Sequence, residues 1–174
     1  MTVLVTGGAG YIGSHMVLAL LDAGEKVVVL DDLSTGFTWA VPEGVELVVG
    51  DTGDMALVDR LLARHDVQAI AHFAAKIVVP ESVADPLGDY HNNTSNARSL
   101  IESAVRNRVK HFIFSSTAAV YGEPDKVPVK ESDPAEPMSP YGRSKLMVEW
   151  MLEDTAKAHD CPTSAPMGQF RVIA

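Results

Sequence analysis

The 174-residue sequence has one cysteine, Cys161, which excludes an internal disulfide framework and a zinc site built from several cysteines. It has no apolar run near the roughly 18 residues of a membrane span, and no basic stretch precedes an apolar one at its start. Basic residues are few: 14 Lys and Arg against 23 Asp and Glu give a net charge of −9, which disfavours a nucleic-acid or anionic-membrane partner. We therefore expect a cytoplasmic protein with no metal site, no nucleic-acid partner and no membrane partner.

The length of the chain and its 47% of hydrophobic residues are typical of a single globular domain. Apolar runs and amphipathic segments alternate along it. We expect strands over residues 2–6, 26–30, 45–49, 67–73 and 111–115. We expect helices over 11–23, from Asp54 to Leu62, over 80–108 with a break near Pro86, and over 141–159. The strands are apolar throughout, which is typical of a parallel sheet with both faces covered. The predicted fold class is α/β, a doubly wound parallel sheet.

Three glycines, Gly7, Gly10 and Gly13, separate the first strand from the first helix in the pattern G-x-x-G-x-x-G. In a dinucleotide-binding turn the first glycine permits the tight turn, the second lets the backbone approach a pyrophosphate, and the third lets the helix lie close to the sheet. The helix amides and dipole then favour the diphosphate. The alternative is a simple glycine turn without a ligand.

Acidic residues follow the second and third strands. Asp31 lies 18 residues after Gly13, near the spacing at which a carboxylate binds the adenosine ribose, and it would repel the 2′-phosphate of NADP. These features predict NAD as the cofactor and a Rossmann-like NAD-binding domain over residues 1–160, followed by an irregular tail over 161–174. Asp51 and Thr52 either flank the adenine or simply precede the cap of the next helix.

Tyr141 and Lys145 are four residues apart on the last predicted helix, and therefore share one face. A phenol is a poor base at neutral pH. A lysine ammonium about 6 Å away, at an effective dielectric constant near 20, favours the phenolate by about 2.8 kcal/mol. Tyr141 could then accept a proton from a substrate hydroxyl. The alternative for this pair is a half-exposed amphipathic helix face.

The glycine loop, the acid after the second strand, the Tyr-x-x-x-Lys pair and their order resemble the short-chain dehydrogenase/reductase superfamily, extended type. Within it, the chain resembles the UDP-glucose 4-epimerases (UDP-galactose 4-epimerases) over residues 1 to about 160. The resemblance is carried by Val5–His15, Asp31 with Leu33, His72–Ala75, Glu81–Val83, Asn92-Asn93, His111–Ser116, Val120–Gly122 and Ser139–Glu149.

This resemblance implies a role for each matching residue. Tyr11 and Ile12 join Gly7, Gly10 and Gly13 at the pyrophosphate, and Asp31 holds the ribose. Asp51 and Thr52 lie by the adenine. The cofactor groove is lined by Phe73, Ala74 and Ala75, and Asn92 lies near the cofactor. In catalysis Tyr141 is the base, Lys145 binds the cofactor ribose and assists the tyrosine, and Thr117 bonds the sugar oxygen.

The resemblance implies NAD-dependent epimerisation at carbon 4 of a UDP-hexose by transient hydride transfer, as in galactose metabolism. It also implies a homodimer formed through the long helix and the helix over 141–159. Ala118 and Ala119 stand where related dehydratases carry Asp-Glu, which favours an epimerase over a dehydratase.

Three features depart from this family. Ile77 stands where many epimerases have a lysine near the cofactor phosphates, and Asn96-Ala97 replaces Gly-Thr. Residues 163–174 do not match the family's continuation, so we expect a truncation or a change of reading frame and a chain that is inactive alone. The alternatives are a catalytically silent dinucleotide-binding fragment and another nucleotide-sugar enzyme, a dehydratase or decarboxylase.

Overall fold

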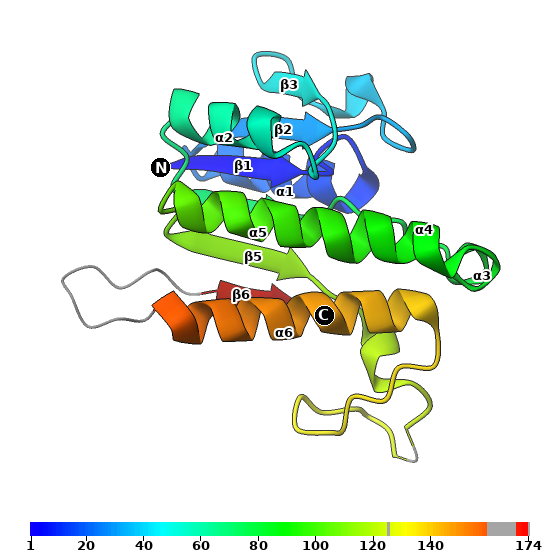
Figure 1. The fold of residues 1–174 in the computed structure, drawn as a ribbon. Coiled ribbons are helices and arrows are strands. Elements are labelled where there is room, and N and C mark those ends of the chain that lie inside the picture. Colours follow the sequence, from blue (N-terminus) through cyan, green and yellow to red (C-terminus); the bar gives the residue numbers. More distant parts are fainter. Residues whose placement is uncertain (125, 160–169, 174) are drawn as a thin grey trace.

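The computed structural model describes residues 1–124, 126–159 and 170–173. Within these residues, six parallel strands form one sheet in the order β3-β2-β1-β4-β5-β6 (Figure 1). The strands are β1 (Thr2–Thr6), β2 (Lys26–Asp31), β3 (Glu46–Val49), β4 (Ala69–His72), β5 (His111–Ser115) and β6 (Phe170–Ile173). The strand order reverses between β1 and β4, which confirms the predicted α/β doubly wound sheet.

Helices connect the strands as the sequence predicts. They are α1 (Tyr11–Asp22), α2 (Met55–Arg64), α3 (Val79–Ala84), α4 (Pro86–Tyr90), α5 (Asn96–Arg106) and α6 (Pro140–His159), with short turns η1 (Thr38–Ala40), η2 (His91–Ser95, a π-turn) and η3 (Ala118–Tyr121). The predicted break near Pro86 is confirmed, because Asp85 ends α3 and its side chain accepts a hydrogen bond from the Gly88 amide in α4. Among the described helices, none combines the length and the hydropathy that a bilayer span requires.

Helices pack on both faces of the sheet, but they cover the two faces unequally. Helices α2, α5 and α6 cover one face, where the main core includes Leu100 of α5 and Val148 of α6 packed over Phe112 of β5 (Figure 1). Helix α1 covers the other face, where Val17 packs on Val5 of β1 and its neighbours. The expectation of two covered faces holds for β1 and β2. On the same face, beside α1, an apolar groove of about 230 Å³ extends across β4 to β5. The side chain of Ile113 in β5 is only half-buried there, so helices do not cover this part of the face.

The predicted irregular tail over 161–174 is wrong in its last part. Phe170–Ile173 forms β6, which pairs in parallel with β5 in the register Phe112 to Phe170. Four residues are too few for a periodic pattern in the sequence, whereas β5 offers an edge of backbone donors and acceptors that a parallel strand satisfies. Residues 160–169, including Cys161, lie outside the described part of the chain.

Candidate functional site

The glycine loop lies between the end of β1 and the start of α1, and its geometry requires glycine at two of the predicted positions. Gly7 has φ of +71°, and a Cβ placed there would lie 2.5 Å from the backbone nitrogen of Ala74. A Cβ at Gly13 would lie 2.1 Å from the carbonyl oxygen of Gly7. The first glycine therefore permits the turn beside β4, and the third permits close packing of α1, as predicted.

Gly10 is less crowded than these two glycines. Within the described part of the chain, a Cβ at Gly10 would meet the Gly7 carbonyl oxygen at 3.3 Å and no other atom within 4 Å. Among the described residues, no side chain caps the N-terminus of α1, and Tyr11 in its first turn is 82% exposed. The first turn of α1 is thus open to an incoming group. Sequence reasoning missed Gly8, whose Cβ would lie 2.7 Å from a Val29 methyl.

Asp31 lies at the end of β2, buried beside the glycine loop. Its Oδ2 accepts a hydrogen bond from the Ala9 amide at 2.9 Å, and its Oδ1 accepts one from the Leu33 amide at 2.9 Å. Each carboxylate oxygen has a further acceptor site, so the side chain can bind ribose hydroxyls while it holds the loop. The position suits the predicted role, and the two amide bonds add a structural role that the sequence does not reveal.

Asp51 lies after β3 and forms a turn of its own. Its Oδ1 accepts hydrogen bonds from the Gly53 amide at 2.6 Å and from the Asn96 side chain at 2.8 Å. The predicted cap of α2 is Asp54, whose Oδ1 accepts the Leu57 amide at 3.0 Å. Asp51 therefore links the turn to α5 through Asn96, one of the positions that departs from the family. Thr52 is buried beside it.

The segment after β4 forms the next wall of the site. The Phe73 amide donates to the carbonyl oxygen of Thr6 at 3.0 Å, so residues 73–75 continue alongside the glycine loop. Asn92, in the π-turn η2, donates to the side-chain oxygen of Asn93 at 3.1 Å. The ends of β1, β2 and β4 thus bring Gly7–Gly13, Asp31 and Phe73–Ala75 to one edge of the sheet.

Tyr141 and Lys145 lie in the first half of α6, and both side chains are buried, with 8% and 4% of their surface exposed. The alternative of a half-exposed pair is therefore wrong. Lys145 Nζ lies 6.0 Å from the centre of the Tyr141 ring and 4.8 Å from the centre of the Phe114 ring. It donates a hydrogen bond to the carbonyl oxygen of Ser115 at 2.9 Å, which joins α6 to the end of β5.

Thr117 begins η3, directly after β5, and its hydroxyl accepts the Ala119 amide at 3.2 Å. The hydroxyl proton of Thr117 remains available for another acceptor. Gly142, next to Tyr141, lets η3 approach α6, because a Cβ there would lie 2.7 Å from the Ala119 carbonyl oxygen. The Ser116 hydroxyl donates to Glu149 of α6. The structure therefore brings Ser116 and η3, which begins after Thr117, against the helix of Tyr141.

Burial lowers the pKa of two side chains that pack against Phe114, Lys145 and His72. Burial lowers the pKa of Lys145 to about 8, and the negative charge of Asp89 acts in the opposite direction. Burial, together with the charge of Lys145, lowers the pKa of His72 to about 3. His72 is consequently a neutral imidazole at neutral pH. Its Nδ1 lies 2.6 Å from the Thr6 hydroxyl, and its ring stacks on Phe114, which is a structural role.

Sequence reasoning gave no role to the polar residues that hold α6 in place. Asn93 of η2 donates to the Ser144 hydroxyl at 3.2 Å and to Asp89 Oδ1 at 3.2 Å. The Tyr141 amide donates to the Ser82 hydroxyl at 3.2 Å. All of these side chains are buried, and the only signal in the sequence is a polar residue at an inward-facing helical position.

Known proteins resemble this chain both in sequence and in fold. Residues 3–167 match the model of a family described as the NAD dependent epimerase/dehydratase family. A UDP-glucose 4-epimerase from Azospirillum brasilense is 54% identical over 157 residues, which are 90% of this chain and 45% of that protein. A probable UDP-arabinose 4-epimerase 3 from Arabidopsis thaliana is 45% identical over 167 residues, which are 91% of this chain and 41% of that protein.

The fold comparison agrees with the sequence comparison. The crystal structure of a UDP-glucose 4-epimerase from Brucella ovis, in complex with NAD, matches with a TM-score of 0.90 and 39% identity, over 98% of this chain and 50% of that one. The resemblance to the UDP-glucose 4-epimerases is thereby confirmed, and the chain spans about half the length of these relatives. Because the family model covers nearly all of the sequence, the chain belongs to the NAD-dependent epimerase/dehydratase family.

Proposed function

We propose that this chain binds NAD at the edge of the sheet where β1, β2 and β4 end. The open side of Gly10 and the uncapped N-terminus of α1 suit a pyrophosphate, because backbone amides and the helix dipole favour a negative group there. Tyr11 and Ile12 would contact it, and Phe73, Ala74, Ala75 and Asn92 would line the groove toward the nicotinamide. Bound NAD would supply a reversible acceptor for a hydride.

Asp31 would hold the adenosine ribose through the acceptor sites that Ala9 and Leu33 leave free. A 2′-phosphate at this place would meet a buried negative charge, so NAD is favoured over NADP. Asp51 and Thr52 would lie by the adenine. The backbone amide of Gly53 and the side-chain amide of Asn96 both donate to Oδ1 of Asp51. The Oδ2 atom of Asp51 would therefore be the acceptor for the adenine.

Tyr141 would act as the general base. The ammonium of Lys145, 6.0 Å from the centre of the tyrosine ring, favours the phenolate electrostatically. Thr117 would donate its free hydroxyl proton to the sugar oxygen and orient it toward Tyr141. Lys145 would also bind the ribose next to the nicotinamide. The transfer of a proton to a placed base typically contributes about 10²–10⁴-fold to a rate.

The reaction that these residues support best is epimerisation at carbon 4 of a UDP-hexose, such as the interconversion of UDP-galactose and UDP-glucose in galactose metabolism. The observation that carries this proposal is the buried Tyr141–Lys145 pair at the same sheet edge as the glycine loop. Ala118 and Ala119 follow Thr117, so this segment offers no acid for the elimination of water.

A second candidate function is dinucleotide binding without catalysis. It needs only the glycine loop and Asp31, which are joined by the hydrogen bond from the Ala9 amide to Asp31 Oδ2. We expect the 174-residue chain to bind NAD in a calorimeter and to produce no UDP-glucose from UDP-galactose. Substrate positioning supplies much of an enzymatic rate, and we propose that the residues of this chain hold mainly the cofactor. Turnover by the purified chain at about 1 s⁻¹ or faster would contradict this expectation.

The epimerase proposal itself is tested with a chimera. Residues 3–159 of this chain replace the matching half of the Azospirillum brasilense relative, and the conversion of UDP-galactose is measured. We expect an active chimera that loses about 10³-fold or more of its rate with Tyr141→Phe, whereas the matched control Tyr90→Phe keeps its rate. Normal turnover by the Tyr141→Phe chimera would refute the assignment of the base.

We also propose a cytoplasmic homodimer that pairs through α5 and α6. Met147 and Trp150, three residues apart on α6, are exposed apolar side chains, and such a pair suits a contact with a second copy. Sedimentation of the wild-type chain and of Trp150→Glu tests this assembly. We expect the variant to be monomeric, and a monomeric wild-type chain would contradict the proposal.

A further inference from the structure

Asp89, in α4, is a buried carboxylate with one unused oxygen. The residue is 3% exposed, and its Oδ1 accepts a hydrogen bond from the Asn93 side chain at 3.2 Å. Its Oδ2 is shielded from solvent and has no hydrogen-bond partner among the described residues. Burying a carboxylate is costly unless an opposite charge or a hydrogen bond compensates for it. One hydrogen bond to Oδ1 leaves Oδ2 uncompensated, and a nearby positive charge would stabilise the carboxylate.

Lys145, on the neighbouring helix α6, is the buried cation of this region. Its ammonium donates to the Ser115 carbonyl and lies over the Phe114 ring, neither of which carries a charge. Of the titratable groups near it, His72 of β4 is neutral and Tyr141 lies on the same helix. Glu149, four residues further along α6, accepts the Ser116 hydroxyl. The charge of Asp89 raises the pKa of Lys145 against the effect of burial.

A hydrogen-bond link fixes the two elements that carry these charges. The Asn93 amide group contacts Asp89 Oδ1 and the Ser144 hydroxyl, each at 3.2 Å. Ser144 directly precedes Lys145, and its hydroxyl donates to the Tyr141 carbonyl oxygen at 2.8 Å. Asn93 also binds the backbone of Lys76 at 2.8 Å and 2.9 Å. A movement of α4 would therefore displace the segment of α6 that holds Tyr141 and Lys145.

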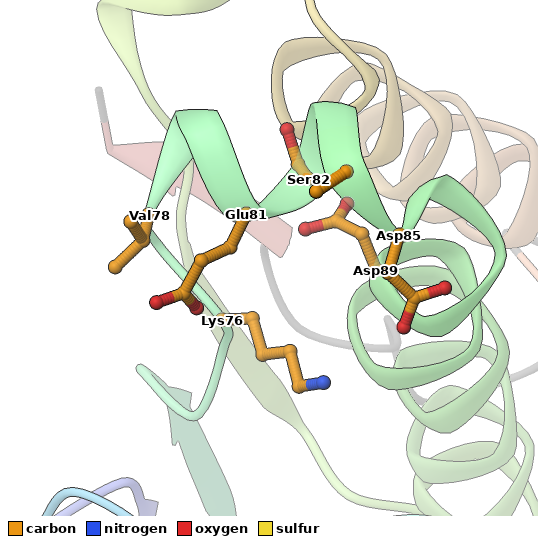
Figure 2. A pocket seen from close by; sticks show the side chains of 7 residues that line it. Lys76, Val78, Glu81, Ser82, Asp85 and Asp89 are labelled. Atoms are coloured by element: carbon orange, nitrogen blue, oxygen red, sulfur yellow. The ribbon is translucent and has the colours of Figure 1, made fainter.

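The other charged groups around Asp89 differ from it in exposure. Asp89 lines a cavity of about 280 Å³ together with Glu81, Asp85 and Lys76 (Figure 2). These three neighbours are exposed, so water screens their charges. Asp85 is also engaged as the cap of α4. Among these acids, Asp89 alone combines burial with a connection to the helix of Lys145.

We propose that Asp89 is the buried counter-charge of Lys145, a positioning residue that holds the lysine in its ammonium form beside Tyr141. The inference rests on the proposed function for its catalytic meaning, because only a charged Lys145 favours the phenolate. The charge pair itself exists in the free protein. It can consequently be tested without NAD and without a substrate.

The test follows the titration of Lys145 by NMR, from about pH 6 to about pH 11, in the 174-residue chain with ¹³C-labelled lysine. The resonance is assigned with Lys145→Arg. Asp89→Asn keeps the shape of the side chain and an acceptor for Asn93, and removes only the charge. We expect the titration midpoint of Lys145 to fall by about one pH unit or more. The control Glu81→Gln removes an exposed charge from the same cavity and leaves the midpoint in place.

A reciprocal measurement covers the case in which Asp89→Asn does not fold. In Lys145→Met, the titration midpoint of the Asp89 carboxyl group, followed by its ¹³C resonance, rises. An unchanged Lys145 midpoint in folded Asp89→Asn, or a protonated Asp89 in the wild-type chain at neutral pH, overturns the proposal. Failure of NAD binding would instead count against the proposed function, since these titrations are made without NAD.

Discussion

The carboxylate of Asp31 fastens the glycine loop to β2, because its Oδ2 accepts a hydrogen bond from the Ala9 amide at 2.9 Å. Its second oxygen holds the Leu33 amide at the turn that follows the strand. The same side chain therefore arranges the loop in the free protein and, in our proposal, binds the adenosine ribose. Loop geometry and cofactor affinity should change together when this acid is altered.

Asp31→Asn leaves one acceptor atom in place of two and removes the charge. We expect the free energy of unfolding to fall by about 1–3 kcal/mol and NAD to bind about tenfold more weakly or worse. Denaturant unfolding and calorimetry measure the two effects. The control is Asp32→Asn. Asp32 is exposed, and its carboxylate accepts hydrogen bonds from the amide and the hydroxyl of Ser34, outside the glycine loop. An Asp31→Asn chain with unchanged NAD affinity would contradict the ribose assignment.

Wild-type chain should bind NAD more tightly than NADP. The buried charge of Asp31 repels the 2′-phosphate, and a charge pair of this kind costs on the order of 1–4 kcal/mol, which corresponds to at least about fivefold in affinity. Calorimetric titration with each dinucleotide at the same ionic strength measures the ratio. Equal or tighter binding of NADP would show that Asp31 does not lie at the ribose.

The glycines of the loop should separate into a structural and a ligand-facing class. Gly13→Ala places a methyl group 2.1 Å from a backbone oxygen that cannot move away. We expect a loss of about 3 kcal/mol in the free energy of unfolding. The methyl group of Gly10→Ala would lie 3.3 Å from the Gly7 carbonyl oxygen, so we expect the free energy of unfolding to fall by no more than about 1 kcal/mol. The same methyl group would block the approach of the pyrophosphate. Unimpaired NAD binding by Gly10→Ala would refute that placement.

Lys145 should make the stability of the protein rise with pH under alkaline conditions. Its pKa is about 8 in the folded chain against 10.5 for an unperturbed lysine, so the unfolded chain binds more protons between these values. The free energy of unfolding therefore increases with pH across this window, by at most about 1.4 kcal/mol per pH unit. Denaturant melts of the wild type and of Lys145→Met measure the difference. Parallel pH profiles of the two chains would contradict the lowered pKa.

His72 should make the protein sensitive to acid. Its pKa is about 3 in the folded chain against 6.5 for an unperturbed histidine, so the folded chain binds fewer protons between these values. Stability contributed by the neutral imidazole is present above about pH 6.5 and is lost as the pH falls toward about 3, at no more than about 1.4 kcal/mol per pH unit. In His72→Phe, the free energy of unfolding should fall less steeply between about pH 6.5 and pH 3 than in the wild type. The control His15→Gln, at an exposed position, should keep the wild-type dependence. Identical profiles for wild type and His72→Phe would refute this origin.

The sequence alone predicted the features that depend on local patterns. The apolar runs ended by Gly7 and Asp31 marked two strands, Asp54 marked the start of α2, and the spacing of Tyr141 and Lys145 placed them on one helix face. Each of these signals lies within one turn, one strand or one helix. Backbone geometry over that distance follows from residue type, so the doubly wound sheet and its loop could be predicted without coordinates.

The tertiary structure decided what depends on residues far apart in the chain. It showed that Tyr141 and Lys145 are buried, that Phe170–Ile173 lies beside β5 in the sheet, and that the buried Asp89 is linked through Asn93 to the helix of Lys145. Nothing near Asp89 in the sequence indicates this, because 56 residues separate it from the lysine. Burial and charge interactions arise only when distant elements pack, and they fix which of the predicted residues are charged, which are neutral, and which can reach a ligand.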